Sequence, residues 1–370
     1  MKTGRDVIEL DLAELRVALS SELAALAGKH VLIVGGAGFL GYYLVQTLTS
    51  ANRCGAVRPL IRVTVWDSYS RGLPAWLAEL AAGSHVTLEQ RSVTDPVGRE
   101  AADFDYIVHA ASIASPTYYK RYPIETMDAN VNGLRNLLEY ARRQADKGRP
   151  LAGFLFFSSS EIYGDPSPDA IPTPETYRGN VSCTGPRACY DESKRFGETL
   201  CVNFAQAHGV RVAMARPFNN IGPGLKISDR RVLPDFARDV LAGRPIEMLS
   251  DGGPRRTYCY VGDAVSGYFK ILVCGRPGEP YNIGVESPEI SVAELAERVS
   301  RSAAELFGYK GRVIRARSDD ATYLDDNPAR RCPTIAKARS ELGYAPKVTL
   351  DDALRRSLLW YKDHPSAGDE

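Results

Sequence analysis

The chain has 370 residues, of which 44% are hydrophobic and 25% are charged; this length is ample for a large core and favours two domains. The net charge of +1 excludes a generally basic surface for nucleic acid or an anionic membrane, so positive charge for an anionic ligand must be local. The seven cysteines are odd in number and lack metal-ligand spacing, which predicts no metal site and favours reduced thiols in a cytoplasmic protein.

Residues 1–28 precede the first predicted strand. Charged side chains interrupt the apolar pattern between Asp6 and Leu26, so we expect neither a signal peptide nor a membrane-spanning helix. An amphipathic helix that packs on the body of the protein or on a second subunit is expected, and a partly ordered tail is the alternative.

The rest of the chain divides near residue 220. Over 29–220, short apolar strands alternate with helical stretches, which predicts right-handed crossover units and a parallel sheet in an α/β domain. Over 221–370 the strands are shorter, Pro and Gly punctuate the sequence, and helices are expected near 292–306 and 351–361. We therefore expect a smaller C-terminal α/β domain that supplies the substrate pocket, with some elements interleaved between the two domains.

A glycine-rich loop follows the first strand of the larger domain. The apolar run 31–34 predicts a buried strand and 42–48 predicts a helix, so the loop has the flanking elements that a dinucleotide-binding motif requires. Gly35 permits a tight turn, Gly38 the close approach of a pyrophosphate, and Gly41 close packing of helix on strand. An ordinary strand-to-helix turn is the alternative. The predicted cofactor contacts at this loop and helix N-terminus are Gly35, Gly38, Phe39, Leu40 and Gly41.

Asp67 follows the next predicted strand, 61–66. An acidic residue at this position binds the ribose hydroxyls of the adenosine and repels a 2′-phosphate, which favours NAD over NADP. Arg71 lies close by in the sequence and weakens that preference. The alternative is a solvated carboxylate at the end of a strand.

Tyr190 and Lys194 are four residues apart and therefore share one face of a predicted helix. A free phenol has a pKa of about 10 and is a poor base at neutral pH. A nearby ammonium group stabilises the phenolate and lowers that pKa, so the pair predicts a catalytic base. Such pairs also arise by chance. The glycine-rich loop and the serines at 158–160 are the features that favour a catalytic role.

Together these motifs resemble the extended short-chain dehydrogenase/reductase superfamily, whose members modify nucleotide sugars. The resemblance covers residues 29–361 and implies a Rossmann fold with a doubly wound parallel sheet, NAD as the cofactor, and catalysis by a serine, a tyrosine and a lysine. By position the serine is Ser159, four residues before Tyr163. The resemblance implies that Ser159 holds the C4 oxygen of the sugar and that Tyr190 removes its proton as hydride passes to NAD. Lys194 would bind the nicotinamide ribose.

The same resemblance places further residues against the cofactor. Ala110, Ala111 and Ser112, after the fourth strand, would lie beneath the nicotinamide ribose. Ser92 and Val93 follow the third strand and would face the adenine. The serine hydroxyl is a weaker partner for the adenine amine than the aspartate that related enzymes usually carry at this position.

Ser160 and Glu161 distinguish the subfamilies. Dehydratases that make 4-keto-6-deoxy sugars carry Asp-Glu directly after their catalytic threonine, and the aspartate protonates the leaving C6 hydroxyl. The pair Ser160-Glu161 instead resembles the UDP-glucuronate decarboxylases. In those enzymes, oxidation at C4 makes a β-keto acid, and the carboxylate leaves as carbon dioxide. A nearby donor or an ordered water must then reprotonate C5.

The resemblance also implies contacts with the nucleotide sugar. Tyr119 occupies the position of a tyrosine that contacts the glucuronate carboxylate. The run 330–333 resembles the arginine motif of the decarboxylases, which implies that Arg331 lies near the sugar carboxylate and the site of reprotonation. Arg231 and Arg256 would bind phosphates of the nucleotide, and Asn219 would bind the diphosphate. A solvated surface charge is the alternative for each of these arginines and for Arg331. The implied substrate contacts are Tyr119, Arg187, Asn219, Arg231, Val232, Arg256 and Arg331.

The activity that the resemblance implies is NAD-dependent decarboxylation of UDP-glucuronate. The product would be UDP-xylose, or UDP-4-keto-pentose if the intermediate leaves before hydride returns. A UDP-uronate 4-epimerase and a nucleotide-sugar 4,6-dehydratase are enzymatic alternatives, and an NAD-binding regulator is a non-enzymatic one. The resemblance also implies a homodimer, formed by the helix that carries the tyrosine and its neighbour near 130–142.

Overall fold

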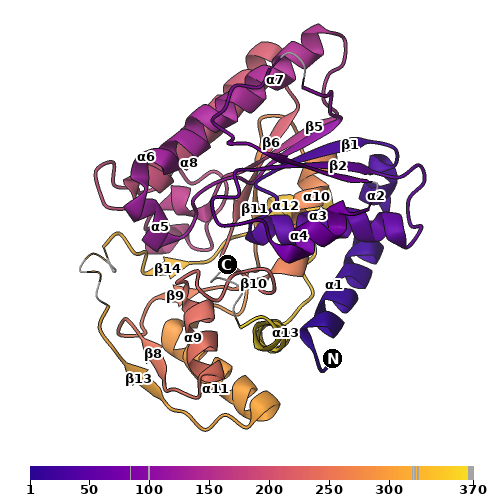
Figure 1. Ribbon diagram of the computed structural model, residues 1–370. Helices are drawn as coiled ribbons and strands as arrows, with labels where there is room; N and C mark the ends of the chain where they lie inside the picture. Colours follow the sequence, from indigo (N-terminus) through magenta and orange to yellow (C-terminus); the bar gives the residue numbers. More distant parts are fainter. Residues whose placement is uncertain (84, 99–100, 319, 321, 323–324, 366–370) are drawn as a thin grey trace.

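The computed structural model describes residues 1–83, 85–98, 101–318, 320, 322 and 325–365. Its centre is a seven-stranded sheet with the strand order β11-β6-β5-β4-β1-β2-β3 (Figure 1), and every pairing in it is parallel. The predicted Rossmann α/β fold is thereby confirmed. The strands are β1 (His30–Val34), β2 (Arg62–Asp67), β3 (Val86–Gln90), β4 (Tyr106–His109), β5 (Gly153–Phe157), β6 (Val212–Pro217) and β11 (Pro280–Ile283).

Helices cover both faces of the sheet. Alternate residues of a strand point to opposite faces, so Leu32 and Val34 of β1 pack into a core with α7 and α8, whereas Val31 and Ile33 pack into a core with α3 and α10. Burial on both faces explains why the strands are continuous apolar runs. These helices are α3 (Phe39–Arg53), α7 (Leu134–Asp146), α8 (Ala188–His208) and α10 (Val261–Cys274).

The other helical segments connect these layers or build the smaller region. The two helices predicted near 292–306 and 351–361 are present as α11 and α13. The segments are α1 (Gly4–Ala18), α2 (Ser20–Leu26), α4 (Ala75–Ala81), α5 (Pro116–Arg121), α6 (Pro123–Asp128), α9 (Val232–Leu241), α11 (Val292–Phe307), α12 (Ala336–Leu342) and α13 (Leu350–Asp363), with a π-helical turn at Ala129–Gly133 and 3-10 turns at Ser160–Tyr163 and Pro168–Ala170.

Short strands form the smaller region, which Figure 1 shows below the main sheet with α9 and α11. In one of its small sheets β9 pairs with β14 in parallel, and Arg256 lies opposite Arg331. β11 belongs to the main sheet although its residues lie beyond 220, so the two regions predicted from the sequence share one sheet. The short strands are β7 (Asn220–Ile221), β8 (Ile246–Met248), β9 (Arg255–Arg256), β10 (Cys259–Tyr260), β12 (Ile290–Ser291), β13 (Val313–Arg315) and β14 (Arg330–Arg331).

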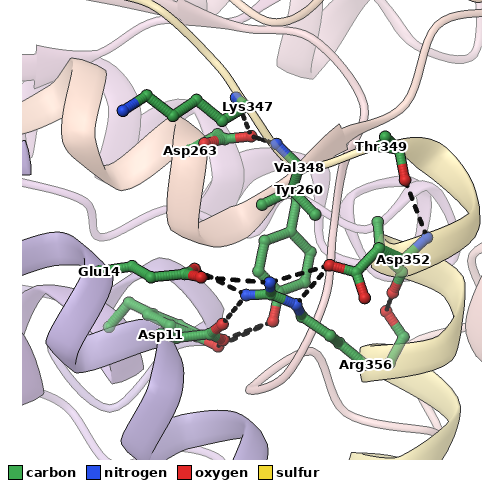
Figure 2. A network of polar contacts seen from close by, with 12 residues as sticks. Asp11, Glu14, Tyr260, Asp263, Lys347, Val348, Thr349, Asp352 and Arg356 are labelled. Carbon is green, nitrogen blue, oxygen red and sulfur yellow. Dashed lines mark hydrogen bonds and ion pairs between the residues drawn. The ribbon is translucent and has the colours of Figure 1, made fainter.

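The N-terminal extension, residues 1–28, forms two helices rather than one. The backbone leaves helical geometry at Leu19, where φ is −113° and ψ is 20°. α1 packs on α13, α10 and α3 of the same chain. At this junction Asp11 is buried and pairs with Arg356 (Figure 2). The extension is therefore part of the core of this chain.

Candidate active site

The glycine-rich loop between β1 and α3 forms a cradle. Gly35 has a φ of +85°, and a Cβ there would lie 2.5 Å from the amide nitrogen of Ala111. A Cβ at Gly41 would collide with the backbone of Gly36. At Gly38, among the residues that the structure describes, it would meet only the Gly35 carbonyl oxygen, at 3.3 Å. Gly38 thus faces open space, as the approach of a pyrophosphate requires.

The N-terminus of α3 is available to an anion. Gly38 is the N-cap, and no side chain in the described ranges caps this helix. The amides of Phe39 and Leu40 lie in the first turn, where N–H groups have no acceptor within the helix. The helix dipole adds positive potential at this end. Cradle and helix end together fit the pyrophosphate of a dinucleotide.

Asp67 lies at the end of β2 with its carboxylate against the glycine-rich loop. Its Oδ2 accepts a hydrogen bond from the Ala37 amide at 3.0 Å, and its Oδ1 accepts one from the Tyr69 amide at 2.9 Å. The carboxylate is therefore held by backbone amides. Because each oxygen can accept more than one hydrogen bond, both retain capacity for a ribose hydroxyl.

Ser92 and Val93 lie in the turn after β3. The Ser92 hydroxyl is 2.7 Å from the hydroxyl of Thr94, and the Ser92 amide donates to Asp95 at 2.9 Å. Val93 packs against Gly133, where a Cβ would come within 2.7 Å of its side chain. These contacts hold the turn in place; its role at the adenine stays a prediction.

The segment after β4 lies against the glycine-rich loop. The Ala110 amide donates to the Val34 carbonyl at 2.8 Å. Within the described residues, the buried hydroxyl of Ser112 has no hydrogen-bond partner, so it can bond a ligand. His109, which the sequence analysis did not single out, is buried beneath this segment. Burial and the charge of Lys194 lower its pKa to about 3, so His109 is a neutral part of the core.

Ser159, Tyr190 and Lys194 meet at the C-terminal edge of the sheet. Ser159 follows β5 and caps the 3-10 turn that begins with the buried Ser160, accepting a hydrogen bond from the Glu161 amide at 3.1 Å. Tyr190 and Lys194 lie in consecutive turns of α8, with the Lys194 Nζ 5.7 Å from the centroid of the tyrosine ring. The predicted shared helix face is therefore present.

Burial dominates the ionisation of Tyr190 and Lys194. Burial raises the pKa of Tyr190 to about 12, although a hydrogen bond with Ser159 opposes that rise. Burial also lowers the pKa of Lys194 to about 7, and the Lys194 Nζ donates to the Phe157 carbonyl at 2.7 Å. The pKa of Tyr190 lies above its usual value because burial is the largest influence on it, and a lowering of that pKa by Lys194 stays a prediction.

Glu161 joins two arginines from distant parts of the chain. It forms ion pairs with Arg187, the N-cap of α8, and with Arg331 on β14. Burial alone would raise the pKa of Glu161, but the two guanidinium groups lower it to about 2, so Glu161 is a carboxylate at neutral pH. The Arg331 side chain is only 3% exposed, which rules out a solvated surface charge.

Asp191 is a further carboxyl group of this cluster, and the sequence analysis gave it no role. Its side chain is 7% exposed, and its Oδ2 lies 3.9 Å from the Arg187 Nε. Burial and the charge of Glu161 raise its pKa to about 7, against the effect of Arg187. The sequence contained one signal for Asp191: it directly follows Tyr190 near the N-terminus of the same helix. Both residues therefore lie at the same end of that helix.

Tyr119 on α5 stacks against Tyr190. The ring centroids are 5.1 Å apart and the planes differ by 15°. In the described part of the chain the buried Tyr119 hydroxyl has no hydrogen-bond partner, and burial raises its pKa. Tyr119 is thus a neutral hydroxyl donor next to the predicted base, which fits a contact with a polar group of the sugar.

Arg256 lies beside Arg331 across the β9–β14 pairing. It is buried, and its guanidinium donates to the Pro328 carbonyl at 2.6 Å and to the side chain of Asn327 at 3.0 Å. Burial and the charge of Arg331 lower its pKa to about 10. It therefore adds a third positive charge near Glu161, beside Arg187 and Arg331, and its contact with a phosphate stays a prediction.

The remaining predicted substrate contacts lie around α9 and β10. Asn219 has a φ of 36° and its side chain donates to the Thr257 carbonyl at 3.1 Å. Arg231 is the N-cap of α9, which begins at Val232, and it forms an ion pair with Asp229 at 2.9 Å. The roles of these residues toward a diphosphate stay predictions.

Residues 31–284 match the model of the NAD dependent epimerase/dehydratase family. The chain belongs to this family. Curated relatives include UDP-glucuronic acid decarboxylase 3 of Arabidopsis thaliana, which is 36% identical over 88% of this chain and 86% of that protein. UDP-glucuronic acid decarboxylase 1 of Xenopus tropicalis is 33% identical over 90% of this chain and 72% of that protein.

Solved structures of the family agree with the fold. The dTDP-glucose 4,6-dehydratase of Streptomyces venezuelae, solved with NAD bound, is 25% identical and superposes with a TM-score of 0.75 over 90% of this chain and 97% of its own. The UDP-glucose 4-epimerase of Thermotoga maritima is 23% identical, with a TM-score of 0.74 over 91% of this chain and 100% of its own, and supports the fold alone.

NAD is the cofactor of this family member. The open cradle at Gly38, the uncapped α3 and the unpartnered Ser112 hydroxyl fit such a dinucleotide. Among the described residues, no helix is long and apolar enough to cross a membrane. The same residues contain no group of three or more His, Cys, Asp or Glu side chains that is placed to hold a metal ion.

Proposed function

We propose that this protein is a UDP-glucuronate decarboxylase that forms UDP-xylose, or UDP-4-keto-pentose when the intermediate leaves before hydride returns. The observation that carries the proposal is the Glu161 carboxylate, held between Arg187 and Arg331 beside the predicted base Tyr190. Ser160 stands where a dehydratase needs an acid. The similarity to UDP-glucuronic acid decarboxylases, 36% and 33% identical over most of the chain, supports the same activity.

The chain's own side chains account for the proton and charge transfers. NAD, when bound, would supply the acceptor for the hydride of C4 and the donor that returns it. Ser159 holds the C4 oxygen, Tyr190 removes its proton, and Lys194 supplies positive charge behind the tyrosine. The C4 ketone then accepts the electron pair of the breaking bond between C5 and the carboxylate. No strong acid is needed at residue 160 because no hydroxyl group leaves.

Two buried donors are available for the substrate's carboxylate. Within the described residues, the Nε atoms of Arg187 and Arg331 have no hydrogen-bond partner. Each guanidinium group is already oriented by its ion pair with Glu161. A substrate carboxylate can therefore bind there without displacing Glu161, and charge-assisted hydrogen bonds of this kind are short and strong.

The test is to incubate the purified protein with UDP-glucuronate and to follow carbon dioxide, sugar products and NADH absorbance together. Carbon dioxide with UDP-xylose or its 4-keto relative is the expected result, and the NADH signal reports how much hydride returns. Conversion to UDP-galacturonate without carbon dioxide would make the protein an epimerase. Turnover of a neutral nucleotide sugar to a 4-keto-6-deoxy product would make it a dehydratase. No reaction with any of these substrates would favour the NAD-binding regulator.

We further propose that the protein is a homodimer through α8 and its neighbour near 130–142, which is the π-helical turn with α7, and that α6 extends this interface. Both α6 and α7 pack against α8, and the three helices lie on one side of the sheet (Figure 1). Ile124 on α6 is 59% exposed and Phe196 on α8 is 51% exposed, and Tyr122 and Met127 extend the apolar surface. A two-fold interface that covers this patch would remove it from water.

We also propose that the protein works in the cytoplasm. All seven cysteines lie within the described residues, and none of them is in a disulfide. Free thiols persist in a reducing compartment. Fractionation of the source cells, with the activity assay above as the readout, tests this proposal.

A further inference from the structure

Decarboxylation of a uronate sugar consumes one proton. The bond between C5 and the carboxyl carbon breaks, carbon dioxide leaves without a proton, and the electron pair passes to the C4 ketone as an enolate. That pair and one proton then form the new C5–H bond. On the function proposed above, the site must therefore obtain one proton in every turnover.

Two carboxyl groups share Arg187 in the Glu161 cluster. Glu161 takes both Arg187 and Arg331, whereas Asp191 reaches only Arg187, at 3.9 Å. Asp191 Oδ1 is buried and has no hydrogen-bond partner within the described part of the chain. A buried carboxylate that lacks donors holds a proton more readily than one that is fully paired. Asp191 is therefore the weaker acid of this coupled pair.

The groups around Asp191 come from five elements. Negative charge comes from Glu161 on the 3-10 turn and from Asp326 ahead of β14, and positive charge from Arg187 and Arg331. Burial is the largest influence and the repulsion from Glu161 the second, and together they raise the pKa of Asp191 to about 7. The charged and titratable groups near this cluster are Tyr119 on α5, Glu161, Arg187, Cys189 and Tyr190 beside Asp191 on α8, Arg256 on β9, Asp326, and Arg331 on β14.

We propose that Asp191 takes up one proton when the carboxylate of a uronate sugar enters this site, and that this stored proton is the one added to C5. A second anion that shares Arg187 and Arg331 leaves less positive charge for Asp191, so the proton becomes more tightly held. After the enolate forms, Asp191 transfers its proton to C5 and returns to the carboxylate. A neutral sugar brings no carboxylate and gives no such uptake.

The experiment measures protons taken up on binding by the NAD-loaded protein with the substitution Tyr190→Phe, which stops oxidation at C4 and hence decarboxylation. Titration calorimetry in two buffers of different ionisation enthalpy gives the number of protons bound. At about one pH unit above the pKa of Asp191, Asp191 is mostly ionised in the free protein. We expect uptake approaching one proton with UDP-glucuronate and none with UDP-glucose.

Two further variants in the Tyr190→Phe protein assign the uptake. Asp191→Asn is expected to abolish it, whereas Glu192→Gln, the next residue of α8 and an exposed partner of Arg195, is expected to leave it unchanged. Uptake that persists in Asp191→Asn, or no uptake with Asp191 intact, overturns the inference. The measurement of proton uptake with Asp191 intact does not depend on the folding of Asp191→Asn. Carbon dioxide from the wild-type protein is assayed separately, so failure of the proposed function is distinguishable from failure of this inference.

Discussion

Arg356 on α13 donates from its Nη1 to Oδ1 of Asp11 on α1, at 2.6 Å, and both side chains are buried (Figure 2). The other oxygen of Asp11 accepts hydrogen bonds from the hydroxyls of Tyr43 on α3 and Tyr260 on β10. One carboxylate thus joins the N-terminal extension to the C-terminal helix. Because Tyr43 lies two residues after Gly41, it also joins the extension to the helix that would bind the cofactor's pyrophosphate.

Replacing Arg356 by Met is expected to destabilise the protein by about 3–5 kcal/mol, because it leaves the buried Asp11 carboxylate without its cation. Urea denaturation at neutral pH measures the free energy of unfolding. Arg355→Met on the exposed side of the same helix is the control, with an expected change within about 0.5 kcal/mol. Equal effects of the two substitutions would contradict the role of the pair.

The contribution of Asp11 to stability should depend on pH. Burial raises its pKa to about 6, against the opposing hydrogen bonds from Tyr260 and Tyr43, whereas an aspartate in an unfolded chain has a pKa of about 3.9. The folded state therefore binds this proton more tightly, and the contribution falls as pH rises from about 4 to about 6. At about 1.4 kcal/mol per pKa unit, the expected loss is roughly 3 kcal/mol.

The measurement for Asp11 is the free energy of unfolding of the wild-type protein and of Asp11→Asn at a series of pH values. As pH rises through this window, the free energy of unfolding of the wild-type protein should fall relative to that of Asp11→Asn. Above the window the difference between the two should stay constant. A difference that does not vary with pH between about 4 and about 6 would show that Asp11 keeps an ordinary pKa in the folded protein.

Replacing Tyr190 by Phe is expected to lower the rate of carbon dioxide release about 10²–10⁴-fold while NAD binding is retained, because only the proton-accepting group is removed. Release of carbon dioxide and binding of NAD are measured on the same preparation. Tyr309→Phe removes a hydroxyl that donates to the Arg244 carbonyl in the smaller region and should leave the rate unchanged. Unchanged turnover in Tyr190→Phe would remove the basis for an enzyme of this mechanism.

Replacing Arg331 by Lys is expected to lower kcat/KM for UDP-glucuronate at least about tenfold, with a small effect on the binding of UDP. An ammonium group cannot pair with Glu161 and at the same time offer the planar, bidentate contact that a second carboxylate needs. The control is Arg330→Lys, the neighbouring arginine, which pairs with Glu289 and is 40% exposed. Equal losses of kcat/KM in the two variants would point to a structural effect. A loss of UDP binding as large as the loss of kcat/KM would point to the same.

Replacing Phe196 by Glu is expected to convert the proposed dimer to a monomer, because a charge in the centre of an apolar interface must be desolvated without a partner. Light scattering after size-exclusion chromatography gives the mass. Val17 on α1 is 79% exposed and lies outside the patch, so Val17→Glu should leave the mass unchanged. A wild-type monomer, or a dimer that survives Phe196→Glu, would exclude this interface.

Local patterns were sufficient to predict the nucleotide-binding half of the protein. The strand, glycines and helix at 31–48 act through backbone geometry and helix dipole, which depend on neighbours in the sequence, and the structure has the predicted cradle. The spacing of Tyr190 and Lys194 likewise predicted a shared helix face. It did not predict their ionisation, because pKa values depend on burial, which the spacing does not contain.

By itself the sequence determined the parallel α/β architecture, because strand and helix periodicities and glycine positions are local properties of the chain. Only the tertiary structure decided that Glu161 lies between Arg187 and Arg331, which are separated from it by 26 and 170 residues. It also decided that Asp191 is a buried carboxyl group short of donors and that Asp11 anchors the N-terminal extension. These features arise from charges that folding brings together at long range and removes from water, and no local pattern of residue types encodes that desolvation.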